Sequence, residues 1–211
     1  MMFDIEYKGG NTIVISTKKT TLVFDPKASS VGLKDVVLKD SVELLTDQKS
    51  SVINDDAKLV ISVPGEYGVG DVDVVAIAAN GRSDSNKTKS SVIYKLIIGE
   101  HRVVVFGNID EKLNDIQLEK IGTVDILIIP VGNHGYTLDS MGASKIIKNI
   151  EPKIVIPIHY DDGVSKYEVP QDKVEVFLKE LDTTPETTSK LKIKSGHTYL
   201  PGLTVVVLEV S

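Results

Sequence analysis

The sequence predicts an α/β fold in which two β-sheets pack face to face and helices cover the outside. The first half is rich in strands, because short runs of β-branched residues alternate there with turn signals. The second half alternates helical periodicity with short continuous apolar runs, which are typical of parallel strands buried on both faces. With 211 residues, of which 41% are hydrophobic, the chain can build one core, so we expect a single domain over residues 1–211.

Eight strands are expected in the first half, and most are bounded by turn residues such as Gly, Asn or Lys. They cover residues 3–7, 12–16, 21–25, 42–45, 58–63, 72–79, 91–98 and 102–106. Gly65, Gly68 and Gly70 indicate a tight loop, because the strand–GxGxxG–helix context of a dinucleotide site is missing around them. The polar segment 82–90 is expected to be a mobile loop.

Helices and strands alternate in the second half. Asp110 is expected to cap a helix at 111–121, and Thr137 or Asp139 a helix at 139–150, while residues 171–181 form an amphipathic helix. The expected strands are 125–130, 154–158, 190–194 and 204–210, and the short stretch 182–188 has the composition of a linker. Residues 203–208 would form an apolar edge strand, which pairing with a second copy of the chain would protect.

Composition excludes several classes of function. A formal net charge of −6 argues against phosphate-backbone binding, so we expect no nucleic-acid partner. The chain has no Cys, which excludes disulfides and Cys-ligated metal sites. Residues 1–7 lack the basic and apolar stretches of a signal peptide, and no run of apolar residues is long enough to span a membrane. We therefore expect a cytoplasmic protein with no membrane partner.

Polar side chains follow three of the predicted strands. Asn108, His134 and His159 each come just after an apolar run, and ligand sites of α/β layers form at the carboxyl ends of strands. Each residue also has a structural interpretation. Asn108 after a glycine is typical of a turn, and His134 between Asn133 and Gly135 is typical of a solvated loop. His159 would be partly buried, either as a hydrogen-bonded structural side chain or as a ligand.

Two acidic positions complete the candidate pocket rim with His134. Asp25 ends a strand before a proline and could equally form a structural corner. Asp161 follows His159 closely and could assist a metal, although two Asp before a glycine also favour a turn. No two His are spaced i, i+2 or i, i+4, so the sequence holds no local zinc clamp. His101 and His197 are expected at the surface.

Four pieces of sequence follow one another along most of the chain. They are Leu22-Val-Phe-Asp25-Pro26, Val60-Ile-Ser-Val-Pro-Gly65-Glu-Tyr67, Val105-Phe-Gly107-Asn108 and the segment 124–160. Their order resembles the metallo-β-lactamase superfamily, and within it the branch of small hydrolase-like proteins similar to L-ascorbate-6-phosphate lactonase. The resemblance implies a four-layer αββα sandwich of two mixed β-sheets flanked by helices, in a family of metal-dependent hydrolases.

The resemblance also implies where metal ligands should lie. The His-x-His-x-Asp-His run and the bridging carboxylate of the family fall on Asp47, Lys49, Ser51, Val52 and Asn108. The last family His matches His159, the one family ligand that is retained. No His or Cys occurs in residues 1–100, so no shift of the alignment restores the missing ligands.

A catalytic zinc needs three protein ligands and an open position. One imidazole and a neutral amide do not supply them, and Lys49 adds positive charge. We therefore expect a non-catalytic, degenerate member of the family that acts as a binding or assembly protein for an unknown small molecule or protein, with no cofactor. The alternative is a hydrolase of a small lactone or phosphoester, with zinc or manganese at a reduced or relocated site. Its candidate ligands are Asp25, Asp47, His134, His159 and Asp161.

Overall fold

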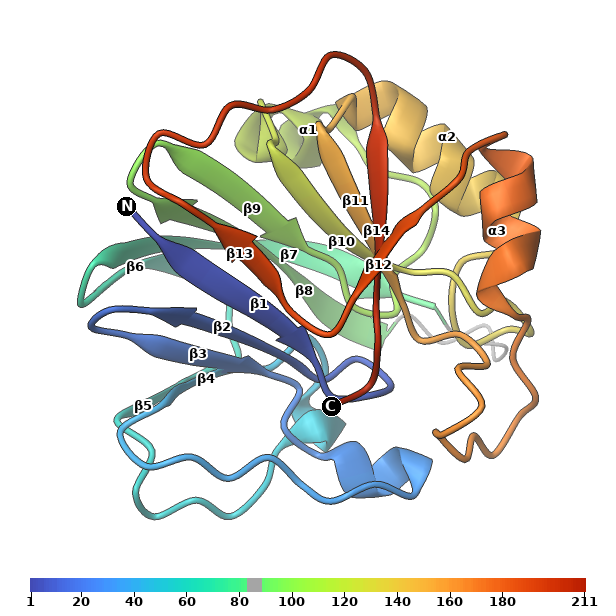
Figure 1. Cartoon of the computed structure of the whole chain (residues 1–211). Helices are drawn as coiled ribbons and strands as arrows, with labels where there is room; N and C mark the ends of the chain where they lie inside the picture. The colour runs from blue at the N-terminus through green and yellow to red at the C-terminus, as the bar shows by residue number, and fades with distance from the viewer. Residues whose placement is uncertain (83–88) are drawn as a thin grey trace.

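Two mixed β-sheets pack face to face in the protein, with α-helices outside (Figure 1). The computed structural model describes residues 1–82 and 89–211. The six-stranded sheet has the order β13-β1-β2-β3-β4-β5, and the eight-stranded sheet has the order β12-β14-β11-β10-β9-β8-β7-β6. The α/β arrangement predicted from the sequence is therefore confirmed. Most of the loop expected at 82–90 lies outside the described residues.

The six-stranded sheet is built almost entirely from the N-terminal part of the chain. Its strands are β1 (Phe3–Tyr7), β2 (Ile13–Thr17), β3 (Thr21–Phe24), β4 (Val42–Leu44), β5 (Leu59–Ile61) and β13 (Leu191–Ile193). The pairs from β13 to β3 are antiparallel, whereas β3, β4 and β5 run parallel. The 3₁₀ turns η1 (Ala28–Val31) and η2 (Gln48–Ser50) follow β3 and β4.

The eight-stranded sheet joins an antiparallel hairpin region to a parallel region. Its strands are β6 (Gly65–Val69), β7 (Val72–Gly81), β8 (Lys89–Ile98), β9 (His101–Val105), β10 (Ile126–Pro130), β11 (Ile154–Ile158), β12 (Glu186–Thr188) and β14 (Thr204–Leu208). Strands β9, β10, β11 and β14 run parallel, so their carboxyl ends meet at one edge of the sheet. That edge carries the candidate site.

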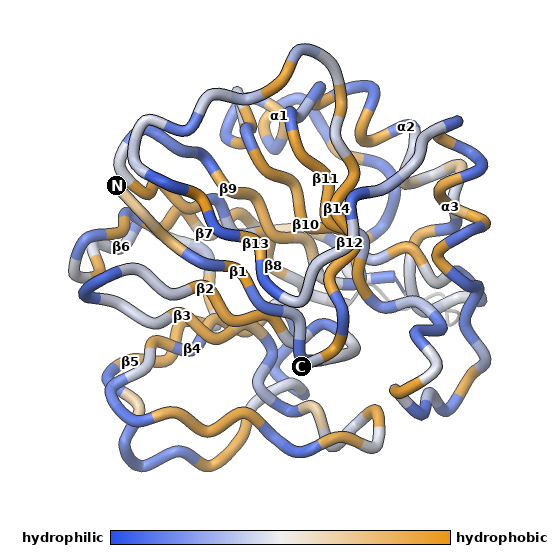
Figure 2. Tube along the Cα trace, viewed as in Figure 1, coloured by the Kyte–Doolittle hydropathy of each residue, from blue (hydrophilic) through white to orange (hydrophobic). Residues whose placement is uncertain are grey.

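One apolar cluster fills the space between the sheets, and a second lies under the helices. In β1 the residues Phe3, Ile5 and Tyr7 are buried while the two residues between them are half-buried, as expected for a strand with one face on the core. Every residue of β10 and β11 is buried, because these strands lie between the two clusters. Figure 2 shows the same strands as hydrophobic stretches inside a more polar outline.

The α-helices pack on the outer face of the eight-stranded sheet. They are α1 (Asp115–Ile121), α2 (Ser140–Ile150) and α3 (Val174–Glu180). Ile121, Ile146 and Phe177 are buried against that sheet, one from each helix. The expected cap Asp139 does begin α2, where its side chain accepts from the Gly142 amide. No helix in residues 1–82 or 89–211 is long and apolar enough to cross a membrane.

Several sequence-based expectations about local structure are wrong. The first helix begins at Asp115 rather than 111, because Asn114 and Gln117 form a capping box in place of the expected cap Asp110. The glycine-rich segment after residue 64 is the strand β6, paired with β7. The linker-like stretch contains β12, which pairs with β14. Strand β14 is therefore an inner strand, and the apolar edge expected at 203–208 does not exist.

Candidate functional site

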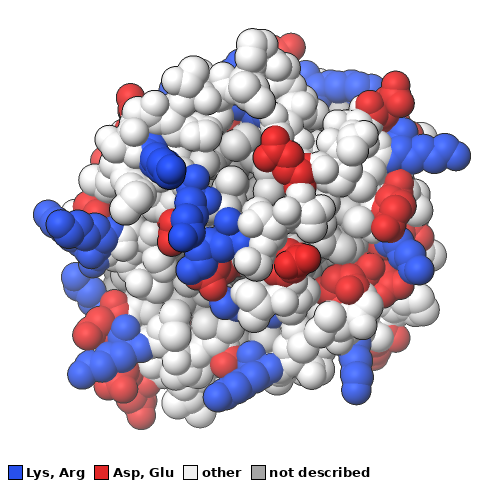
Figure 3. Space-filling model, in the orientation of Figure 1, with Lys and Arg blue, Asp and Glu red and all other residues white. Residues whose placement is uncertain are grey.

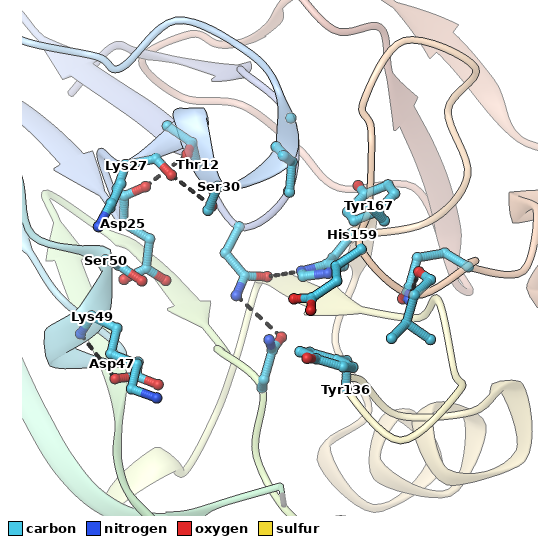
Figure 4. Close-up of a pocket in the computed structure, with 18 residues that line it drawn as sticks. Thr12, Asp25, Lys27, Ser30, Asp47, Lys49, Ser50, Tyr136, His159 and Tyr167 are labelled. Atoms are coloured by element: carbon cyan, nitrogen blue, oxygen red, sulfur yellow. Dashed lines mark hydrogen bonds between the residues drawn. The ribbon is translucent and has the colours of Figure 1, made fainter.

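A cavity of about 360 Å³ opens where strands of both sheets end (Figure 4). Five residues singled out in the sequence line it, each just past the end of β3, β4, β9 or β11. They are Asp25, Asp47, Lys49, Asn108 and His159. Positions far apart in the sequence thus share one cavity, whose size suits a small molecule.

His159 is held rigidly at the end of β11. Its backbone adopts a positive φ of 51°, and its backbone N–H donates to the Tyr7 hydroxyl at 3.1 Å. Its ring stacks on Tyr167 with 4.9 Å between ring centroids, and its Nδ1 lies 2.9 Å from the Asn11 side-chain oxygen. Burial lowers the pKa of His159 to about 4, because the charged imidazolium would lose its hydration. The imidazole is therefore neutral at neutral pH.

Asn108 reaches the cavity because Gly107 lets two segments approach closely. A side chain at Gly107 would meet Thr46 directly, so the end of β9 can pack on the end of β4 only with glycine there. The Asn108 Oδ1 accepts a hydrogen bond from Asn11 Nδ2 at 3.1 Å. Asn11 thus joins the β1–β2 turn to the ends of β9 and β11.

Asp25 is a buried carboxyl group that anchors the loop after β4. Its backbone has a positive φ of 43°, which is strained for a residue other than glycine. The carboxylate accepts from the Thr46 amide at 2.8 Å and from the Thr46 hydroxyl at 2.5 Å. Burial raises the pKa of Asp25 to about 7, and the hydrogen bonds from Thr46 oppose this only in part.

The loop that aligns with the family's metal-binding run has only part of its length in the cavity. Asp47 caps η2 by accepting from the Lys49 amide at 3.0 Å, and both residues line the cavity together with Ser50. Ser51 and Val52 do not line it. Of the four positions aligned with the family's run, Asp47 and Lys49 therefore line the cavity, and the chain leaves it after η2.

Of the three residues expected at a possible pocket rim, Asp25 lines the cavity, whereas His134 and Asp161 do not. The half-exposed His134 ring lies 3.0 Å from a carboxylate oxygen of Asp172, as expected for a solvated loop residue. Asp161 accepts from the Gly163 amide in a turn. His101, expected at the surface, is buried with its Nδ1 2.7 Å from the Tyr199 hydroxyl.

Sequence reasoning missed several residues that complete the cavity walls. They include Asn11, Lys27, Tyr136, Tyr167, Glu168 and Gln171. Asn11 follows a pair of glycines and looks like an ordinary turn residue in the sequence. The others lie on loops without periodicity. No sequence signal separates them from other polar loop residues, because their convergence depends on the packing of distant strands.

The residues of the cavity do not fit the metal centre of the family. Within residues 1–82 and 89–211, no three His, Cys, Asp or Glu side chains lie close enough to hold a metal ion. Of the positions aligned with family ligands, Asp47 and His159 bear metal-binding groups and line the cavity, while Lys49 brings a cation. Two such groups are fewer than the three protein ligands that a catalytic zinc needs.

Comparison with known proteins places the chain in a family. The sequence pattern of the family described as "Beta-lactamase superfamily domain" matches residues 4–159, which is most of the chain. The chain therefore belongs to the metallo-β-lactamase superfamily. Among solved structures it is similar to a candidate Zn-dependent hydrolase of this superfamily from Thermotoga maritima, with a TM-score of 0.78 and 24% identity over 99% of this chain and 100% of that chain.

Further relatives carry hydrolase names. A metallo hydrolase from Ignicoccus hospitalis has a TM-score of 0.68 and 14% identity, covering 92% of this chain and 99% of that one. At such identities the solved structures show the fold alone. A "UPF0173 metal-dependent hydrolase" of Aeropyrum pernix is 27% identical over 49% of this chain. A second from Thermoplasma acidophilum is 45% identical over 21%. The chain spans 41% and 20% of the lengths of these two relatives.

Proposed function

We propose that this chain binds a small, uncharged polar molecule in the cavity and does not use it for metal-dependent hydrolysis. The observation that carries the proposal is the chemistry of the aligned ligand positions within one cavity. Asp47, Lys49, Asn108 and His159 bring one carboxylate, one ammonium, one amide and one neutral imidazole to it. These groups suit hydrogen bonding to an organic molecule better than coordination of a dinuclear centre.

The balance of charge around the cavity favours an uncharged ligand. Lys27 and Lys49 bring two positive charges to its walls, and Asp47 and Glu168 bring two negative charges. The Asp25 carboxyl group, whose pKa burial raises to about 7, adds part of a further negative charge at pH 7. The amides of Asn11 and Asn108 and the neutral ring of His159 line the same cavity. A net anion would therefore find no excess of positive charge and a cation only the partial charge of Asp25, whereas a neutral polar molecule would find donors and acceptors.

The proposal is tested by binding measurements in the presence of EDTA. A library of neutral polar fragments is screened by protein-observed NMR. The Asn108→Leu variant alters the cavity wall, and the His134→Ala variant, which changes a residue outside the cavity, is the control. We expect fragments that shift resonances of cavity residues, bind at least tenfold more weakly to Asn108→Leu and bind unchanged to His134→Ala. Binding that requires added zinc, or hits confined to anionic fragments, would contradict the proposal.

A second candidate is a metal-dependent hydrolase with a reduced or relocated metal site, acting on a small lactone or phosphoester. The names of the relatives favour this candidate over a non-catalytic role, since they are called metal-dependent hydrolases. Two of its five candidate ligands, His134 and Asp161, lie outside the cavity, and Asp25 is tied to Thr46. Asp47 and His159 are the cavity residues on which such a site would depend.

A panel of hydrolysis assays distinguishes the two candidate functions. A p-nitrophenyl ester, a γ-lactone and bis-p-nitrophenyl phosphate are each assayed in EDTA, in zinc and in manganese. Turnover that needs the metal and disappears in His159→Ala supports the hydrolase and contradicts the first proposal. No turnover of any substrate in any of the three conditions counts against the hydrolase.

A further inference from the structure

Asn11 lines the cavity between Asn108 and His159 and contacts both side chains. Its side-chain nitrogen donates to Asn108 Oδ1 at 3.1 Å, and its side-chain oxygen lies 2.9 Å from His159 Nδ1. The three residues come from the β1–β2 turn, the end of β9 and the end of β11. Figure 4 shows both interactions as dashed lines, the second one ending at the labelled His159.

The orientation of the Asn108 amide in the structure sets the direction in which protons are shared. A side-chain carbonyl oxygen can only accept, so the Asn11 atom that faces Asn108 Oδ1 must be the amide nitrogen. The other Asn11 atom is then its carbonyl oxygen, which also can only accept. His159 Nδ1 therefore has to carry the proton that this oxygen accepts. His159 thus donates to Asn11, and Asn11 donates to Asn108.

This order determines what His159 presents to a ligand. A neutral imidazole carries one N–H, so a proton on Nδ1 leaves a lone pair on Nε2. Nε2 has no hydrogen-bond partner within residues 1–82 and 89–211, and the ring lines the cavity. Stacking on Tyr167 and the bond from the His159 backbone to Tyr7 hold the ring in this orientation. Asn108 uses its side-chain oxygen to accept from Asn11, so its amide nitrogen keeps its own N–H donors.

We propose that Asn11 is a positioning residue that holds His159 as the Nδ1–H tautomer, so that the cavity offers an acceptor at Nε2 and a donor at Asn108 Nδ2. A matching ligand carries a hydrogen-bond donor and an acceptor of its own, as a primary amide or a hydroxyl group does. The ligand half of this inference rests on the proposed function. The tautomer half does not, because it concerns the protein without a ligand.

The tautomer is measured directly by long-range ¹H–¹⁵N NMR of the ¹⁵N-labelled protein at pH 7 in EDTA. The four His are distinguished by the loss of one ring signal in His159→Gln. We expect Nδ1 of His159 to have the shift of a protonated nitrogen and Nε2 that of an unprotonated one. A protonated Nε2 with an unprotonated Nδ1 would overturn the inference, since the Asn11 side chain would then have to be flipped.

Two variants of Asn11 separate positioning from a merely structural role. Asn11→Leu keeps the size of the side chain and removes the acceptor, so we expect His159 to gain Nε2–H, the form that a free histidine side chain favours. Asn11→Asp keeps an acceptor beside Nδ1, so we expect Nδ1 to stay protonated. An Nδ1–H tautomer that persists unchanged in a folded Asn11→Leu protein would overturn the role of Asn11.

The ligand half is tested with benzamide and N,N-dimethylbenzamide, which differ in the N–H donors that only the first possesses. We expect benzamide to shift the His159 Nε2 resonance and to bind at least tenfold more tightly than its dimethyl analogue. Equal binding would overturn the predicted ligand chemistry. A correct tautomer with no binding by either probe would count against the proposed function and the ligand half, while the positioning role of Asn11 would stand.

Discussion

Replacing Asp25 by asparagine should change how the stability of the protein depends on pH. Burial raises the pKa of Asp25 from 3.8 to about 7 in the folded protein. The folded state therefore holds this proton more tightly than the unfolded chain does. The stability that the neutral group provides is fully present below about pH 4 and is lost as the pH rises through about 7.

The size of the effect follows from the shift. About three pKa units at ~1.4 kcal/mol each give roughly 4 kcal/mol. An asparagine at this position would keep the structural role of the neutral acid, because its oxygen can accept from the Thr46 amide and its nitrogen can donate to the Thr46 hydroxyl. Between pH 4 and pH 8, the Asp25→Asn variant should therefore gain about 4 kcal/mol of stability relative to the wild type.

The assay is urea unfolding followed by far-UV circular dichroism, since the chain has no Trp. The difference in free energy of unfolding between variant and wild type is measured at intervals from pH 4 to pH 8, so that contributions of the other groups cancel. A difference that stays constant within about 1 kcal/mol, or that changes in the opposite direction, would refute the burial argument for Asp25.

Three further predictions concern single residues. His159→Gln should have the opposite pH dependence: the wild type should lose about 3 kcal/mol relative to this variant as the pH falls from 7 to 4, because the pKa of His159 is lowered from 6.5 to about 4, and the same unfolding series checks it. Gly107→Ala should cost ~1–3 kcal/mol in thermal unfolding, since the new methyl group meets Thr46; an unchanged Tm would contradict the packing. Asn114→Ala should cost about 1 kcal/mol by loss of the helix cap, whereas a neutral result would mean that α1 does not depend on it.

The sheets and helices could be predicted because periodicity is a local property. Continuous apolar runs predict strands at 125–130 and 154–158, and the structure has β10 at Ile126–Pro130 and β11 at Ile154–Ile158. Strand β6 was missed because glycines suggest loops, and here the pairing with β7 outweighs that preference. Buried His101 was missed because its cover, Phe3 and Tyr199, comes from distant parts of the chain.

The candidate site could be predicted in part, at the positions that follow strands. Asn108 and His159 were found because the carboxyl ends of strands in α/β sheets gather in space. Asn11 could not be found, because its importance depends on two contacts, to residues 97 and 148 positions away in the sequence. His134 follows a strand as well, but the loop after β10 turns its side chain toward Asp172 and away from the cavity.

Acidic and basic side chains are interspersed on the face seen in Figure 3, in keeping with the net charge of −6. Several charged side chains of the protein form ion pairs, such as Lys190 and Glu6 at 2.6 Å. Arg102 pairs with Asp125 at 3.1 Å on another part of the chain.

The most direct test of the account is the metal content of protein purified without chelator, followed by calorimetric titration with zinc and with manganese. The account predicts far less than one metal ion per chain and no heat of binding that depends on His159, because the described part of the cavity supplies too few ligands. Near-stoichiometric metal that is lost in His159→Ala would contradict it, and would make the hydrolase the leading explanation of this fold and cavity.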